Sequence, residues 1–225
     1  MRYNTLLLGL FLLFLASCAS QQLQQPQPLP INWGENRVNI GTENIRAEIH
    51  TSGQLDNNLP QPLAGATVRF DGYNTGLWDH TENVYSAYNV AGISFKGFDR
   101  TQLSLIHWDD GHDRELFLGV RYTDLVNWLR WIDFGVNDDA FICNTRLAFD
   151  AWCGSTIEPS FEVLRNWDQD KTPGKAEILW FFPSKWLNSS HIRPFIGGDL
   201  RVDDMGESFT RNRDFTAQAG ISATF

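Results

Sequence analysis

The last eleven residues of the chain, FTAQAGISATF (residues 215–225), show the pattern that determines the fold. Every second position carries an apolar side chain: Phe215, Ala217, Ala219, Ile221, Ala223 and Phe225. Successive side chains of a β-strand point to opposite faces, so the alternation predicts a strand with one apolar and one polar face. The two phenylalanines are ten residues apart, and a tilted strand of about 9–11 residues can cross a membrane.

The same period of two recurs through most of the preceding sequence. Apolar and polar residues alternate within residues 44–50, 64–71, 85–95, 114–122, 157–163 and 192–203. Turn-forming sequences lie between such runs, for example Asp110-Gly111 and Thr172-Pro173-Gly174. Closely spaced strands with hardly any helical periodicity predict an all-β fold, an antiparallel up-and-down β-barrel or a sandwich.

We expect a single barrel domain over residues 37–225. The candidate strands number about eleven, and closed bacterial barrels have even counts, so we predict about ten strands, with eight and twelve as alternatives. An additional short strand near Val38–Ile40 would raise the count. Residues 123–135, TDLVNWLRWIDFG, fit a helix or a strand. We favour the strand because the neighbouring segments are strands and tight turns flank it.

The alternation does not say which face of the barrel meets water. In a soluble barrel the apolar face forms the core, whereas in a membrane barrel it contacts lipid and the polar face lines the interior. In the membrane barrel, charged side chains would fill the interior with ion pairs. The candidates for this interior set are Arg46, Glu48, Arg69, Asp71, Arg146, Asp150, Glu158, Glu162, Arg193 and Arg201.

Residues 215–225 resemble the closing strand of bacterial outer-membrane barrels, which favours the membrane barrel. In that family the barrel-assembly machinery reads the terminal aromatic residue and the alternate apolar residues before it. The resemblance implies that Phe215, Ile221 and Phe225 form this signal, although the alanines between them are smaller than is usual. Tyr85 and Phe95 repeat the ten-residue aromatic spacing, as expected for aromatic girdles at the two membrane interfaces.

The N-terminal sequence MRYNTLLLGLFLLFLASCAS, residues 1–20, predicts export. One Arg, a short apolar run and small residues before a break are typical of a secretory signal peptide, here over residues 1–17. Residues 15–18, Leu-Ala-Ser-Cys, resemble the lipobox of bacterial lipoproteins. The resemblance implies that lipoprotein-processing enzymes cut before Cys18 and attach lipid to it. Residues 18–36 are rich in Gln and Pro and predict an extended tether.

The composition argues against a nucleic-acid partner. The formal net charge is −9, and the chain contains 14 Arg but only 4 Lys. Nucleic-acid binding requires clustered positive charge, which an acidic chain of this kind does not supply. Arg forms multiply hydrogen-bonded ion pairs more readily than Lys, so the excess of Arg favours charges held in networks.

Two cysteines remain if Cys18 is acylated. Cys143 and Cys153 have the same strand parity, and an exported protein meets an oxidising compartment, so we predict a disulfide between them. Two unpaired buried thiols are the alternative. The sequence has no CxxC or HxxxH spacing, so we predict no metal centre and no cofactor.

The segment HWDDGHD, residues 107–113, is the strongest candidate for chemistry. His107, Asp110 and His112 could bind a divalent cation or act as an acid/base pair, and outer-membrane proteases use such residues at a barrel rim. Asp110-Gly111 is also a favoured hairpin turn, and turns are naturally polar. We favour a turn without a catalytic role.

These features together predict a lipid-anchored outer-membrane β-barrel with a structural or surface-interaction role and no catalytic function. Its expected partners are outer-membrane lipid, the barrel-assembly machinery and the lipoprotein-processing enzymes. One alternative is a soluble, lipocalin-like periplasmic barrel on the same tether, binding a small apolar ligand. Gly76-Leu77-Trp78 is similar to the GxW signature of that family. A third possibility is an outer-membrane hydrolase with its site at residues 107–113.

Overall fold

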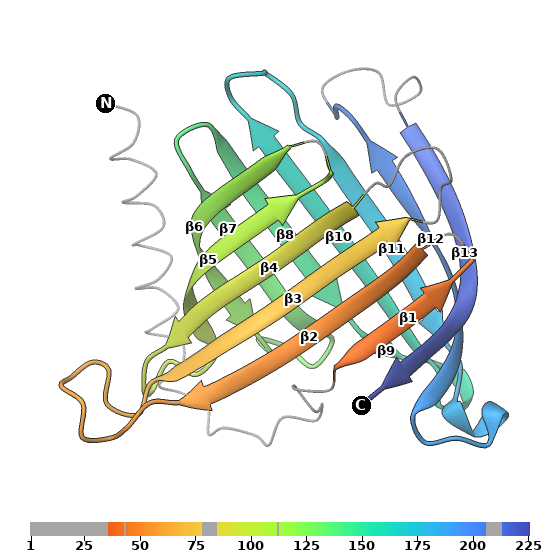
Figure 1. The fold of residues 1–225 in the computed structure, drawn as a ribbon, viewed down its shortest axis with the longest axis horizontal. Coiled ribbons are helices and arrows are strands. Elements are labelled where there is room, and N and C mark those ends of the chain that lie inside the picture. Colours follow the sequence, from red (N-terminus) through yellow and green to blue (C-terminus); the bar gives the residue numbers. More distant parts are fainter. Residues whose placement is uncertain (1–35, 43, 78–84, 112, 206–212) are drawn as a thin grey trace.

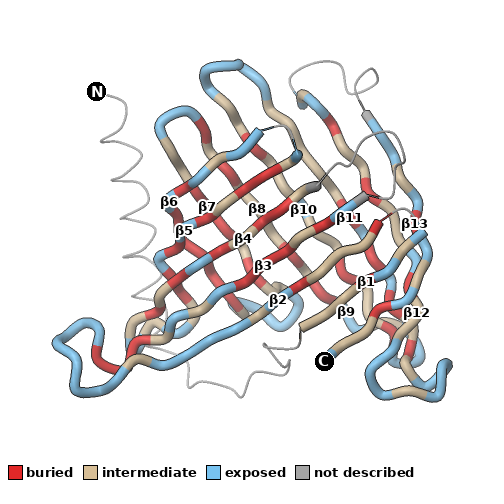
Figure 2. Tube along the Cα trace, in the orientation of Figure 1, coloured by how far each residue is buried: buried red, intermediate tan, exposed pale blue. Residues whose placement is uncertain are grey.

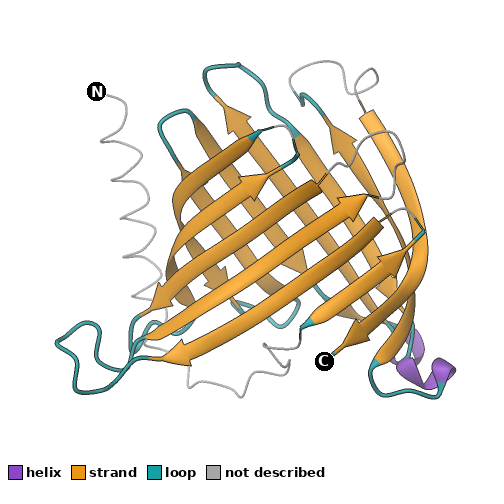
Figure 3. Ribbon diagram, in the orientation of Figure 1, coloured by secondary structure: helices purple, strands orange, loops and turns teal. Residues whose placement is uncertain are grey.

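The computed structural model describes residues 36–42, 44–77, 85–111, 113–205 and 213–225, which form a β-barrel with strongly tilted strands (Figure 1). The strands within these residues are β1 (Arg37–Gly41), β2 (Asn44–Gln54), β3 (Thr67–Leu77), β4 (Tyr85–Ser94), β5 (Thr101–Asp109), β6 (Arg114–Thr123), β7 (Leu129–Val136), β8 (Ala140–Leu147), β9 (Phe149–Asp150), β10 (Thr156–Asn166), β11 (Gly174–Phe181), β12 (Ile192–Val202) and β13 (Arg213–Thr224). Two short 3₁₀ turns accompany them, η1 (Trp152–Gly154) and η2 (Ser184–Leu187) (Figure 3). In the described part of the chain, no helix is long and apolar enough to cross a membrane.

The described strands form one closed antiparallel sheet. Each strand pairs with its neighbour in the chain, and β13 pairs with β1 to close the barrel. Because β8 and the two-residue β9 both pair with β10, they are two parts of one interrupted barrel strand. The barrel therefore has twelve strands, which confirms the predicted all-β barrel and selects twelve over the favoured ten.

The count is twelve because the short strand expected near Val38–Ile40 is present as β1, in addition to the eleven candidate strands. β1 has only five residues, too few to establish an alternating pattern. The ambiguous segment 123–135 divides into a turn and the strand β7, which begins at Leu129, so the preference for a strand is confirmed for its second half. The turn residues Leu125 and Trp128 are exposed and do not form a helix.

The two faces of the barrel wall differ in polarity, and buried and exposed positions alternate along the strands (Figure 2). On β6, Phe117 is fully buried, whereas the next residue, Leu118, is 63% exposed. The exposed apolar side chains on the outward face come from strands around the whole barrel: Ile40, Ile49, Val68, Phe70, Leu103, Leu105, Leu116, Leu118, Phe161, Ile178, Ile196, Phe215 and Ile221. The apolar face therefore points outward.

The inward face combines charged residues with two small apolar clusters. The larger cluster includes Ile106, Phe117 and Ile142, all of them fully buried. Beside it, Gly119 and Gly135 lie opposite each other on β6 and β7. A Cβ atom on Gly119 would lie 2.3 Å from the carbonyl oxygen of Phe134, so this close approach of the two strands requires glycine.

The predicted disulfide between Cys143 and Cys153 is not present, and both residues are free thiols. Cys143 lies opposite Val163 on β10, whereas Asp150 lies opposite Thr156. These positions on β10 are seven residues apart, or about 23 Å at about 3.3 Å per residue. Cys153 follows in η1, beyond the reach of a disulfide, whose Cα atoms lie within about 7 Å. The residues between the cysteines continue along β10 instead of turning back.

Candidate functional site

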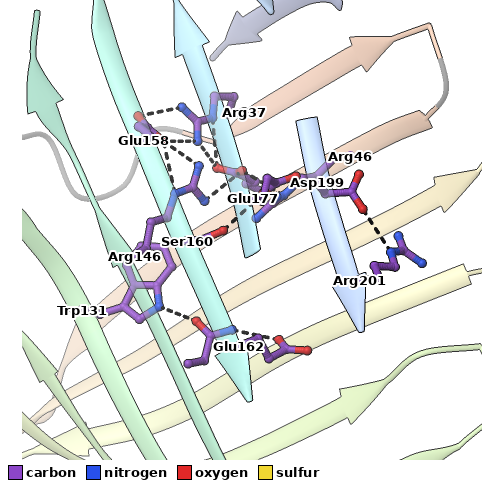
Figure 4. Close-up of polar contacts among 12 residues, drawn as sticks. Arg37, Arg46, Trp131, Arg146, Glu158, Ser160, Glu162, Glu177, Asp199 and Arg201 are labelled. Carbon is purple, nitrogen blue, oxygen red and sulfur yellow. Dashed lines mark hydrogen bonds and ion pairs between the residues drawn. The ribbon is translucent and has the colours of Figure 1, made fainter. Parts of the chain in front are cut away.

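The lumen of the barrel is crossed by a four-residue ring of ion pairs that joins strands far apart in the sequence (Figure 4). Arg37 on β1 contacts Glu48 on β2 at 2.6 Å and Glu158 on β10 at 3.0 Å. Arg146 on β8 contacts the same two carboxylates, at 3.0 Å and 2.6 Å. The period-two pattern turns each of these side chains inward, and the closure of the barrel brings them together.

Arg46 extends this ring toward β11. Its Nε lies 3.1 Å from Glu48 Oε1, and its Nη1 donates to Glu177. Ser160 Oγ also donates to Glu177, at 3.4 Å. Arg130 on β7 approaches Glu158 at 4.0 Å.

A second network lies on β6 and β7. Arg121 donates two hydrogen bonds to Asp133, from Nε at 2.6 Å and from Nη2 at 2.7 Å. Its remaining terminal nitrogen donates to Asp71, and His50 Nδ1 lies 2.8 Å from the other oxygen of Asp71. Tyr88 donates its hydroxyl hydrogen to Asp133 at 2.8 Å. The two carboxylates therefore satisfy every charged nitrogen of Arg121.

Two aromatic rings separate the networks and contact both of them. Tyr73 and Trp131 pack with their ring centroids 5.2 Å apart. The Arg146 guanidinium carbon lies 5.7 Å from the Tyr73 centroid and 5.4 Å from the Trp131 centroid. Arg121 approaches Trp131 from the other network, at 5.2 Å. These distances allow cation–π attraction, which couples the two networks through Trp131.

Charge is balanced within the two networks. They join five arginines to five carboxylates, namely Arg37, Arg46, Arg121, Arg130, Arg146, Glu48, Asp71, Asp133, Glu158 and Glu177. A buried charge is tolerated only when it is paired and hydrogen-bonded. Because of this balance, the charged side chains can remain buried and closely packed inside the barrel.

An apolar cluster narrows the lumen at the end that carries the C-terminal residue Phe225. Leu179 and Phe181 on β11 pack with Phe195 on β12, and all three are buried. Arg37 lies over the Phe181 ring at 4.6 Å, and Arg193 approaches the same ring at 5.6 Å. The cluster and the Arg37 ring therefore lie next to each other inside the barrel.

The other half of the lumen contains a cavity of about 440 Å³. Its wall includes Trp108, Trp131, Asn144 and Glu162. Glu162 accepts hydrogen bonds from Trp108 Nε1 at 2.7 Å and from Asn144 Nδ2 at 2.9 Å. Trp131 Nε1 in turn donates to Asn144 Oδ1 at 3.3 Å. This chain of hydrogen bonds holds the Glu162 carboxylate beside two indole rings.

The predicted interior set is largely confirmed. The buried networks contain five of the candidates: Arg46, Glu48, Asp71, Arg146 and Glu158. The inward face of the barrel, which the register of the strand pairs defines, also carries four further members: Arg69, Glu162, Arg193 and Arg201. Asp150 lies opposite Thr156 on the same face by register, but it is exposed at the end of the strand and takes no part in the two networks.

Five members of the networks were not predicted from the sequence: Arg37, Arg121, Arg130, Asp133 and Glu177. Arg121 and Glu177 stand at polar positions of alternating strands and could have been included on that signal. Asp133 lies in the segment that fitted both a helix and a strand. Arg37 is the first residue of the short strand β1, where no pattern identifies the inward face.

A hairpin connection joins β5, which includes residues 107–109, to β6, as favoured from the sequence. Asp110 N donates to Asp113 O at 3.2 Å, and Gly111 N donates to Asp109 Oδ1 at 2.8 Å. His107 lies on the outward face near Asn89, whereas Asp110 lines the cavity, so the two are not brought together. His112 lies outside the described residues. Within the described ranges, no three His, Cys, Asp or Glu side chains are grouped to hold a metal ion.

The proposed assembly signal lies on the outward face of β13. Phe215 and Phe225 are each 73% exposed, and Ile221 between them is also exposed. Phe225 N donates to Asn36 O at 3.0 Å, beside the closure of β1 on β13. Cys18 and the tether lie outside the described residues.

No protein-family model matches the chain, and no curated protein is significantly similar to it. Function is therefore inferred from two features of the barrel. One is the apolar outward face, and the other is the charged and partly filled lumen.

Proposed function

We propose that the protein is a lipid-anchored β-barrel of the bacterial outer membrane, with a structural or surface-interaction role and no catalytic one. The supporting observation is the orientation of the wall, with leucine, isoleucine and phenylalanine outward and arginine and carboxylates inward. Membrane barrels have this arrangement, in which lipid covers the apolar band and the polar face lines the interior.

The extent of the outward apolar surface supports the proposal. Its members come from nine of the described strands, namely β1, β2, β3, β5, β6, β10, β11, β12 and β13. A soluble monomer rarely exposes a contiguous apolar patch larger than about 300–600 Å². A belt of this kind would favour aggregation in water, whereas lipid acyl chains would cover it.

The dimensions of the wall fit a bilayer. Phe215 on β13 and Phe225, which directly follows β13, are ten residues apart, or about 34 Å at about 3.4 Å per residue. With a strand tilt of about 40°, this length spans about 26 Å, close to the apolar band of about 25 Å in outer-membrane barrels.

Aromatic side chains lie near both ends of the outward face. Near one end, Trp128 stacks on Phe149 at 6.1 Å, and Phe182 packs against Trp180 and Trp186 at 5.0 Å each. Toward the other end, the outward-facing residues include Phe134, Phe141, Trp167 and Phe215. Aromatic girdles at the two interfaces are typical of membrane barrels.

The filled lumen supports a closed protein rather than an open pore. Ion pairs join β1 and β2 directly to β8, β10 and β11 across the interior. The Leu179, Phe181 and Phe195 cluster adds an apolar obstruction near one end. A soluble barrel with a small apolar ligand would need an apolar interior, which these charges do not provide.

The position of Arg37 is compatible with the proposed anchor. β1 starts there, beside Phe225, so the tether joins the barrel at the end that carries the C-terminal residue. Eighteen residues separate Cys18 from Asn36, a reach of at most about 60 Å when fully extended. Lipid on Cys18 could therefore enter the membrane leaflet nearest that end.

The proposal is tested by expressing the full chain with its own leader in a Gram-negative host. We expect the protein in the outer-membrane fraction, with different gel migration before and after boiling in detergent. The matched variant Cys18→Ser should lose acyl-chain labelling and leave the heat-modifiable barrel in the membrane. A protein that is monomeric in water without detergent, with no heat-modifiable form, would contradict the membrane barrel.

A further inference from the structure

We propose that the cavity beside Glu162 binds a small organic cation with an apolar body, such as an arylalkylammonium ion. This goes beyond a structural role and depends on the inward wall alone, not on the membrane. The cavity of about 440 Å³ falls within the size range of small-molecule sites, about 300–1,000 Å³.

Glu162 differs from the other inward glutamates in having no cation partner. Glu48, Glu158 and Glu177 each contact at least one arginine. In the described part of the chain, no Lys, Arg or His nitrogen lies within 4.0 Å of the Glu162 carboxylate, which is held only by the neutral donors of Trp108 and Asn144. The Glu162 carboxylate is therefore oriented toward the cavity without a direct ion pair, although Lys175 lies opposite it on β11.

The cationic side chains of the cavity wall are directed to other carboxylates. Arg46 pairs with Glu48 and Glu177, and Arg146 pairs with Glu48 and Glu158. Arg201 contacts Asp199 at 3.2 Å. Lys175 is the remaining cation of the wall. Most of the positive charge is therefore already neutralised by residues deeper in the barrel.

The mouth of the cavity adds negative charge. Asp110, Asp203 and Asp214 line it, together with Asp109, which Arg114 contacts at 2.8 Å. These residues lie at the β5–β6 turn and at the facing ends of β12 and β13. An acidic entrance raises the local concentration of cations and repels anions.

Aromatic side chains provide the complementary surface for the apolar body. Tyr88, Trp108 and Trp131 line the cavity with Leu164. The hydroxyl of Tyr73 on the same wall has no hydrogen-bond partner within the described residues. A ligand ammonium group would bind Glu162, while its apolar part packs on Trp108 and Leu164.

The test is calorimetric titration of the full chain in polyoxyethylene detergent micelles with 2-phenylethylammonium chloride, with protein-free micelles subtracted. We expect saturable binding, a change in tryptophan fluorescence, and no saturable binding of the neutral 2-phenylethanol or the anionic 3-phenylpropionate. Glu162→Gln should weaken binding about tenfold or more, because it removes a charge-assisted contact and keeps the shape.

Glu115→Gln is the matched control. Glu115 also accepts a hydrogen bond from an asparagine, Asn137 Nδ2 at 2.7 Å, but it does not line the cavity, so binding should be unchanged. Trp108→Phe removes a hydrogen bond to Glu162 and should weaken binding without removing the carboxylate. The proposal is overturned if no saturable binding occurs, if the alcohol or the anion binds as tightly, or if folded Glu162→Gln binds as the parent does.

Discussion

Arg121 and Asp133 lie directly opposite each other on β6 and β7, and neither side chain is exposed. The two hydrogen bonds between them, at 2.6 Å and 2.7 Å, form a bidentate pair. Bidentate arginine–carboxylate pairs are geometrically specific, and removing one partner leaves the other charge buried. The pair therefore helps to fix the register of β6 against β7 as well as the charge balance of the lumen.

We predict that Asp133→Ala destabilises the barrel by about 3–5 kcal/mol, because Arg121 loses its main partner inside the wall. The double variant Arg121→Met with Asp133→Leu should recover most of that loss, since neither charge remains. Urea unfolding in micelles or vesicles measures both free energies.

Asp170→Ala is the control for this prediction. Arg165 and Asp170 also form an ion pair, but their side chains are 38% and 86% exposed. Exposed pairs contribute about 0–1 kcal/mol, so this variant should unfold close to the parent. If Asp133→Ala and Asp170→Ala lowered the free energy of unfolding equally, burial of the ion pair would not determine its contribution to stability.

The barrel was predictable from the sequence because its strands alternate in a single consistent pattern. Leu116, Leu118 and Arg121 are assigned to their faces by parity alone, and the structure confirms each. The alternation does not show which side chains meet across the barrel. The contact of Arg37 with Glu158 joins residues 121 positions apart and depends on barrel closure, which no local pattern encodes.

Short and interrupted segments were less predictable for a different reason. Asp150 has the parity of an interior residue and lies opposite Thr156, but its side chain is exposed at this end of the strand, so parity predicted its face and not its burial. The predicted disulfide is absent because the chain after Cys143 continues along β10, so equal parity does not bring Cys153 close to Cys143. The cavity beside Glu162 required three strands to be aligned, so the sequence alone did not indicate it.

Leu118→Arg tests the orientation of the outward face. If lipid covers this face, an arginine on the outward side of β6 should cost about 2–4 kcal/mol near the bilayer centre. On a water-exposed surface the same substitution should change the free energy of unfolding by no more than about 0.5 kcal/mol. Reversible unfolding into urea from vesicles gives the difference in free energy.

Leu59→Arg is the matched control for the outward face. Leu59 is exposed in the connection between β2 and β3, outside the strands. It should tolerate the charge in either environment. Equal stability of the Leu118→Arg and Leu59→Arg variants would count against a lipid-facing wall.

The apolar obstruction predicts a specific effect on ion flow. The parent barrel should show no steady conductance in a planar bilayer, because ion pairs and the Phe181–Phe195 contact fill one half of the lumen. Phe181→Ala with Phe195→Ala should introduce a measurable leak of small ions. Phe195→Leu keeps an apolar side chain in place and should remain closed.

Each large-to-small core substitution costs about 3–5 kcal/mol, so heat-modifiable migration must first show that the double variant is folded. A folded double variant with no leak would locate the obstruction in the Arg37 and Arg146 ring instead. A conducting parent would contradict the closed lumen.

The three cysteines should have three different chemical states in the native membrane protein. Cys18 should carry lipid, and Cys153, which is exposed in η1, should react with a charged maleimide. Cys143 lies on the outward face of β8, where lipid would exclude a charged reagent, and should react only after unfolding.

Mass spectrometry of the intact protein counts the maleimide labels. We expect one label on the native protein and two labels after denaturation. Cys153→Ser should remove the native label alone. A Cys143–Cys153 disulfide would block both reactions, and native labelling of Cys143 would place the outward face in water.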